Sequence, residues 1–117
     1  MTSFQLQQLM GGHETTRPEK YYMFGRTWNM GESKSAQVLD DIVDGSPVLQ
    51  MGDLRLAFKS RLGRRISAGQ TVSVAPAEKA KDAGTYLVYI PPKDSNAKSY
   101  LPRSLGIAQE VRRYGSN

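Results

Sequence analysis

The residues that decide how this chain folds run from Leu54 to Arg65, with the sequence LRLAFKSRLGRR. Apolar and basic side chains alternate in its first half, which is typical of a strand that buries one face. The stretch contains five basic side chains and no acidic one. Because cations gathered without carboxylates favour a negatively charged partner, the stretch also predicts a surface that binds an anion.

The residues before this stretch predict that it is the second strand of a hairpin. Pro47–Met51 precedes Gly52-Asp53, and a glycine at the first position of a two-residue loop is typical of a type II′ turn. Such a hairpin places one set of side chains on a shared apolar face: Leu49, Met51, Leu54, Leu56 and Phe58. It places Gln50, Arg55 and Lys59 on the other face, and a slip of one residue would mix the two sets.

A helix is the alternative for the same residues. Asp53 can cap its first turn and Gly63 can end it, with apolar residues at Leu54, Phe58 and Leu62. We prefer the hairpin because it explains the residues on both sides of Gly52-Asp53. Arg61 separates the two possibilities, since it shares a face with Arg55 and Lys59 only on an extended strand.

Further strands are predicted on both sides of the hairpin. Tyr21–Trp28 is aromatic and β-prone, and Thr71–Val74 alternates between polar and apolar residues. Thr85–Ile90 is the strongest strand, because it is β-branched or aromatic along most of its length. Since it is mostly apolar, we expect both of its faces to be covered.

Helices are predicted at three places. Ser35–Val43 carries i,i+4 apolar pairs, although its aspartates oppose the helix dipole and a strand running to an Asp44-Gly45 turn is the competing interpretation. Leu105–Tyr114 is the second helix, in which Gly106 is unfavourable. Residues 1–13 are expected to form a short amphipathic helix or an extended arm.

These elements predict a β-rich α+β fold. We expect a small antiparallel sheet or a partly open barrel of about five or six strands, with one short internal helix and helical or arm-like termini. The chain has 117 residues, which suits one domain. We therefore expect an N-terminal arm or helix over residues 1–13 and a single β-rich domain over residues 14–117, with a basic C-terminal half.

The composition disfavours an enzyme. The chain has no cysteine and one histidine, His13, so the usual sets of nucleophile, base and orienting group cannot be assembled. It has no phosphate-binding loop or dinucleotide fingerprint. We predict no catalytic residue, no metal ligand, no cofactor and no small-molecule substrate.

The charge distribution predicts a protein that binds nucleic acid. Residues 1–53 contain four basic and seven acidic side chains, whereas residues 54–117 contain twelve basic and four acidic ones. The basic half suits a phosphate backbone, and we expect a single strand bound without sequence specificity. The expected phosphate contacts are Arg55, Lys59, Arg61, Arg64, Arg65, Arg112 and Arg113. Aromatic residues that would stack on bases are Tyr21, Trp28, Tyr86, Tyr89 and Tyr100, with packing in the core as the competing role.

The alternative is a phage or virus structural or assembly subunit, of the capsid, neck or matrix type. Both termini carry apolar residues suited to interlocking arms, and the separated charges suit contacts between copies or with other particle subunits. The expected oligomer contacts are Phe4, Leu6, Leu9, Ile107, Val111 and Tyr114. The sequence has no apolar run long enough to span a membrane. The expected location is therefore the cytoplasm, or a virus particle assembled there.

Overall fold

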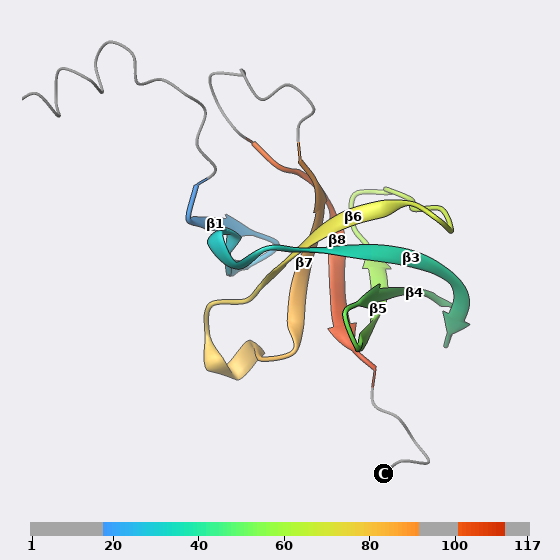
Figure 1. Ribbon diagram of the computed structural model, residues 1–117. Helices are drawn as coiled ribbons and strands as arrows, with labels where there is room; N and C mark the ends of the chain where they lie inside the picture. Colours follow the sequence, from blue (N-terminus) through green and yellow to red (C-terminus); the bar gives the residue numbers. More distant parts are fainter. Residues whose placement is uncertain (1–17, 92–100, 112–117) are drawn as a thin grey trace, which may run out of the picture.

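The computed structural model describes residues 18–91 and 101–111. Within them the chain forms β-strands and two single-turn 3-10 helices, η1 (Met30–Glu32) and η2 (Ala80–Asp82). The strands are β1 (Lys20–Met23), β2 (Arg26–Asn29), β3 (Lys34–Val43), β4 (Ser46–Met51), β5 (Leu54–Ser60), β6 (Thr71–Pro76), β7 (Thr85–Ile90) and β8 (Arg103–Glu110) (Figure 1). The β-rich prediction is confirmed, whereas the described residues contain no α-helix.

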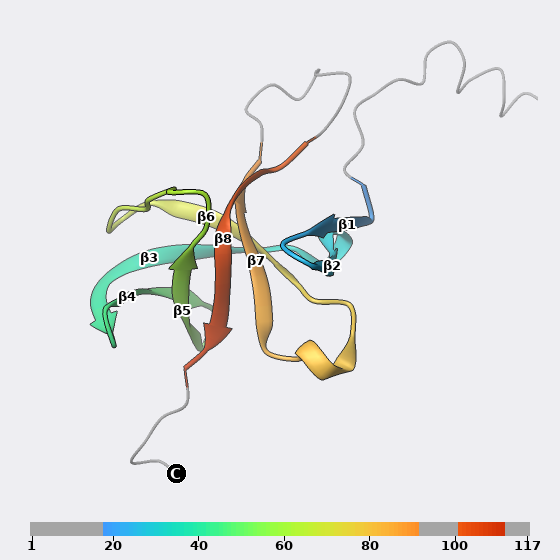
Figure 2. The same ribbon diagram turned by 180° about the vertical axis from the view of Figure 1, so that it is seen from behind.

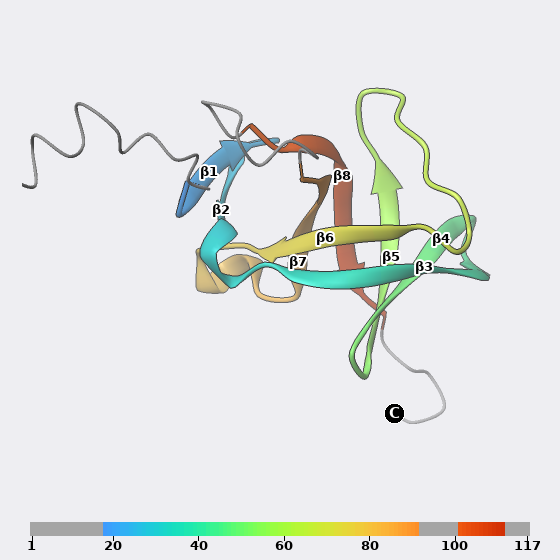
Figure 3. The same cartoon turned by 45° about the horizontal axis from the view of Figure 1, so that its top comes forward.

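Six of the strands form a closed antiparallel barrel in the order β3-β4-β5-β8-β7-β6. The barrel consists of two three-stranded meanders, β3-β4-β5 and β6-β7-β8, which are joined where β3 pairs with β6 and β5 pairs with β8. Figure 3 shows β3 and β6 side by side, running across the direction of β5 and β8. The barrel is closed, whereas the sequence predicted a small antiparallel sheet or a partly open barrel.

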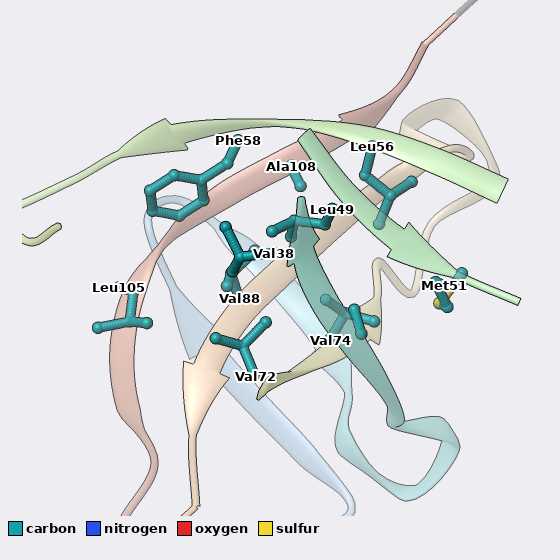
Figure 4. Close-up of a cluster of buried hydrophobic side chains, with 11 residues drawn as sticks. Val38, Leu49, Met51, Leu56, Phe58, Val72, Val74, Val88, Leu105 and Ala108 are labelled. Atoms are coloured by element: carbon teal, nitrogen blue, oxygen red, sulfur yellow. The ribbon is translucent and has the colours of Figure 1, made fainter. Parts of the chain in front are cut away.

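The interior of the barrel is filled by aliphatic side chains and one phenyl ring. Figure 4 shows these side chains pointing toward one another from all six strands. The fully enclosed members are Leu49, Leu56 and Val88, each with no exposed surface. Along the regular parts of the strands, residues pointing inward alternate with residues pointing outward, so every second side chain joins this core.

A second apolar cluster lies outside the barrel, where residues of the β1–β2 hairpin pack against the barrel wall. Figure 2 shows this hairpin outside the ring of barrel strands. Trp28 of β2 is completely buried there against Ala75, Leu87, Tyr89 and Ile107 of the barrel wall. Its indole N–H donates a hydrogen bond to the carbonyl oxygen of Met23 at 2.8 Å. β7 is therefore covered on both faces, as its apolar sequence predicted.

The hairpin predicted from the central stretch is confirmed, and its helix alternative is wrong. Met51 pairs with Leu54 and Leu49 pairs with Leu56, which is the predicted register. Gly52 has a φ of 59°, as the first position of a type II′ turn requires. The predicted apolar face has one exception, because Leu54 beside the turn remains 40% exposed.

The helix predicted over Ser35–Val43 is wrong, since these residues form most of strand β3. The i,i+4 apolar pairs that favoured a helix have cross-strand partners instead: Val38 pairs with Leu49, and Ile42 pairs with Pro47. The competing interpretation holds, because β3 ends in a two-residue turn at Asp44-Gly45 in which both residues have positive φ. Aspartates near a helix C-terminus are unfavourable, and the strand removes that cost.

The helix predicted from Leu105 is also wrong, since Leu105 lies within strand β8. Val88 and Tyr89 pair with Gly106 and Ser104, so Leu105 is the extra residue of a β-bulge. The bulge shifts the alternation of side chains, which lets Leu105 and Ala108 both join the inner core. The arm predicted over residues 1–13 and the end of the predicted C-terminal helix lie outside the described residues.

Candidate nucleic-acid interface

Strand β5 and the loop after it carry five of the seven basic side chains predicted to contact phosphates. Arg55 and Lys59 are exposed on the outer face of β5, because Leu56 and Phe58 point into the barrel. Arg61 extends the ladder beyond the strand, since its backbone N–H donates to the carbonyl oxygen of Leu105 at 2.9 Å. Figure 3 shows the loop between β5 and β6 extending beyond the neighbouring strands.

The loop begins with a tight turn that presents three arginines. The backbone N–H of Arg64 donates to the carbonyl oxygen of Arg61 at 3.2 Å, and the hydroxyl of Ser60 donates to the carbonyl oxygen of Arg64. Arg61 and Arg65 are exposed, whereas Arg64 is half-buried. The Nε atom of Arg64 is buried and has no hydrogen-bond partner among the described residues, so this one N–H group is removed from water without compensation.

Ion pairing divides the predicted phosphate contacts into two groups. Arg55 lies 3.5 Å from a carboxylate oxygen of Asp41 on β3, so its charge already has a partner. The other ion pairs between described residues, Lys20–Glu78 and Arg26–Asp82, lie away from this loop. No described carboxylate pairs with Lys59, Arg61, Arg64 or Arg65.

One further cation lies at the end of the barrel that carries Arg61, and the sequence did not predict it as a phosphate contact. Arg103 is exposed at the start of β8, two residues before Leu105, whose carbonyl binds Arg61. It pairs with Ile90 at the end of β7, and no described carboxylate forms an ion pair with it. Its place depends on the pairing of β5 with β8, which no local pattern reveals. We refer to Lys59, Arg61, Arg64, Arg65 and Arg103 as the basic end.

The aromatic residues predicted to stack on bases are not gathered at the basic end. Trp28 and Tyr89 are 0% and 1% exposed in the outer cluster, so a base cannot reach their faces in this conformation. Tyr21 is half-buried against the same cluster. Tyr100 lies outside the described residues. Core packing was the alternative role predicted for these side chains. Trp28 and Tyr89 have this role, because both are buried in the outer cluster.

Tyr86 lies at the opposite end of the barrel, near the start of β7. Its hydroxyl donates to a carboxylate oxygen of Glu110 at 3.2 Å. Burial raises the pKa of Tyr86 above its usual value near 10, and the negative charge of Glu110 and this hydrogen bond raise it further. A cavity of about 520 Å³ opens at this end, with Met51, Val74 and Tyr86 in its lining. This concave surface is therefore separate from the basic end.

The residues predicted to form oligomer contacts are described only in part. Ile107 is buried in the outer cluster of its own chain. Val111 is half-buried and lines a cavity of about 480 Å³ beside Val48 and Leu54. The remaining predicted contacts, Phe4, Leu6, Leu9 and Tyr114, lie outside the described residues, as do the predicted phosphate contacts Arg112 and Arg113.

Comparisons of the chain with protein-family models, with curated protein sequences and with solved structures found no match. The described part of the chain has no helix of the length and apolar character needed to cross a bilayer. Residues 18–91 and 101–111 also contain no group of three His, Asp or Glu side chains placed to bind a metal ion.

Proposed function

We propose that this protein is a non-catalytic binding protein that contacts single-stranded nucleic acid, without sequence specificity, through its basic end. One observation carries the proposal: the basic end gathers five cations that have no carboxylate partner among the described residues. Like charges held together repel one another, and a phosphate backbone relieves that repulsion while it releases its own counterions.

The shape of the basic end favours contacts to the backbone over readout of base edges. The cations come from a strand end, a tight turn and the start of another strand, and the described residues offer no α-helix to enter a major groove. Arginine and lysine on such a surface bind phosphates wherever they occur along a strand. Binding without sequence preference, and strongly dependent on salt, is the expected result.

The test is a titration of a labelled single-stranded oligonucleotide, followed by fluorescence anisotropy at several salt concentrations. In the triple variant K59A/R61A/R65A, we expect the slope of log affinity against log salt to decrease by about 2, because each phosphate contact to a single strand contributes roughly 0.7. The matched control K34A/K79A/K81A removes three exposed lysines far from the basic end and loses the same charge. Equal losses in the two variants would show that net charge alone is responsible. No binding by the wild-type chain at low salt would contradict the proposal.

A second candidate function, a self-associating structural subunit of a phage or virus particle, has one observation in its favour. Among the described residues, β1 pairs only with β2, so its outer edge has free backbone groups, and Tyr22 on it is 70% exposed. A strand from a second copy can add to such an edge. Light scattering coupled to size-exclusion chromatography tests this, and a strict monomer at high concentration would contradict it.

A further inference from the structure

Three turns in the described part of the chain have positive φ at both central residues: Phe24-Gly25, Asp44-Gly45 and Leu62-Gly63. Turns with this backbone favour asparagine, aspartate or glycine at the first position, because a larger side chain meets the backbone there. Asp44 fits this preference. Phe24 and Leu62 do not, so each needs another reason for its position.

Packing supplies that reason for Phe24 and not for Leu62. The ring of Phe24 packs against the outer apolar cluster under the β1–β2 hairpin, and this burial offsets an unfavourable backbone. Leu62 has a φ of 59° and is 69% exposed. A bulky aliphatic residue that is both strained and exposed gains nothing from its own fold.

The surroundings of Leu62 indicate what it is for. The residue lies between Arg61 and Arg64, in the turn at the start of the loop between β5 and β6. The hydrogen bonds donated by the backbone N–H of Arg64 and the hydroxyl of Ser60 close this turn. The turn therefore exposes one apolar side chain between cations that pair with no described carboxylate. Proteins that bend or unstack nucleic acids often combine these two features, an apolar wedge and basic residues that hold the adjacent phosphates.

We propose that Leu62 is an apolar wedge that inserts between neighbouring bases of the strand whose phosphates the basic end holds. This inference rests on the proposed function and adds a contact that is independent of charge. A single leucine suffices to separate two bases, whereas anchoring in a bilayer needs a larger apolar surface than this turn offers. Nucleic acid is therefore favoured over an anionic lipid surface.

The test uses a single-stranded oligonucleotide that contains 2-aminopurine, a base whose fluorescence rises when it is unstacked. We expect the fluorescence to rise when the wild-type chain saturates the oligonucleotide, and this rise to be absent with saturating Leu62→Asn. The affinity of L62N should fall roughly tenfold, because the apolar contact is lost. Its salt dependence should match that of the wild type, because no charge is removed.

Loss of folding cannot explain this result, since asparagine tolerates positive φ better than leucine does. The melting temperature of L62N should therefore equal or exceed that of the wild type. The matched control Ile42→Thr removes an exposed aliphatic side chain on β3, which is 63% exposed and lies in the acidic segment. I42T should bind and unstack the oligonucleotide as the wild type does.

Two outcomes would overturn the inference, and they are distinguishable. If L62N binds and unstacks the oligonucleotide like the wild type, the wedge is wrong and the proposed function stands. If the wild-type chain binds no oligonucleotide but binds anionic phospholipid vesicles in a way that depends on Leu62, both the wedge and the proposed function are wrong, and the turn is a lipid contact.

Discussion

Gly106 of β8 lies directly against Phe58 of β5. A Cβ atom at Gly106 would stand 2.9 Å from Cε1 of the phenyl ring and 3.1 Å from the backbone nitrogen of Arg61, and it would overlap the carbonyl oxygen of Lys59. Two of these three neighbours are backbone atoms of the paired strand, which cannot move without breaking the pairing of β5 with β8. Glycine at this position therefore allows β5 to pair with β8, which is one of the two pairings that join the meanders and close the barrel.

Replacing Gly106 with alanine should destabilise the protein by about 3 kcal/mol, because the added methyl group overpacks a rigid site. Urea denaturation followed by circular dichroism measures this change. The matched control is Gly31→Ala, where the nearest atom to the new Cβ is a side-chain oxygen of Glu19 at 3.7 Å. It should change the free energy of unfolding by less than about 0.5 kcal/mol. A G106A variant as stable as the wild type would show that β5 and β8 are not in this register.

Trp28 should report whether the β1–β2 hairpin is docked. It is the only tryptophan of the chain and is completely buried. We expect a blue-shifted emission that a soluble quencher such as acrylamide reaches only after unfolding. Trp28→Phe should destabilise the fold by about 2 kcal/mol, because it removes the hydrogen bond to Met23 and leaves a void. Efficient quenching under native conditions would contradict the docked hairpin.

Tyr86 should make the protein less stable in alkali. Its pKa is raised in the folded state, by burial first and then by Glu110, so the folded protein holds this proton more tightly than the unfolded chain. The stabilisation is fully present below the ordinary tyrosine pKa of 10.0 and is lost as the pH rises through the higher pKa of the folded state. Tyr86→Phe should therefore lose less stability above pH 10 than the wild type. Glu110→Gln should behave in an intermediate way. Urea midpoints measured as a function of pH test this, and parallel curves for wild type and Y86F would contradict it.

Arg55 and Lys59 should differ in their contribution to oligonucleotide binding, although both are exposed on the outer face of β5. Lys59→Ala should lower the slope of log affinity against log salt concentration by about 0.7. Arg55→Ala should lower this slope less, because a carboxylate oxygen of Asp41 already lies 3.5 Å from Arg55. Asp41→Asn removes that partner and should strengthen binding. Neither Arg55→Ala nor Asp41→Asn should change stability by more than about 1 kcal/mol, since the pair is exposed. An equal effect of R55A and K59A on this slope would show that the oligonucleotide contacts the whole length of β5.

The parts of the fold that sequence predicted correctly are those set by neighbours along the chain. The β4–β5 hairpin needs only Gly52 and the alternation on either side of it, and the strand over Thr85–Ile90 needs only its own apolar side chains. Likewise, the cations from Lys59 to Arg65 lie within a few residues of one another. Their clustering does not depend on how the barrel closes.

The parts that sequence missed depend on distant partners. Ser35–Val43 carries pairs that suit a helix, and only the pairing with β4 and β6 decides for a strand. At Leu105, the bulge opposite Val88 and Tyr89 breaks the alternation that would have indicated a strand. Arg103 joins the basic end for the same reason, because its position is fixed by strands from elsewhere in the chain.

The strand order of the barrel has a consequence for the order of folding events. Each meander, β3-β4-β5 or β6-β7-β8, is made of strands that follow one another, so its pairings close short loops and form early. The pairings of β3 with β6 and of β5 with β8 join residues far apart in the chain, as Leu56 and Glu110 are, so they close longer loops at a larger entropic cost. Either meander alone leaves its apolar face open to water. We therefore expect the association of the two meanders to limit the rate of folding. In this step the β3–β6 pairing, the β5–β8 pairing and the inner core form together.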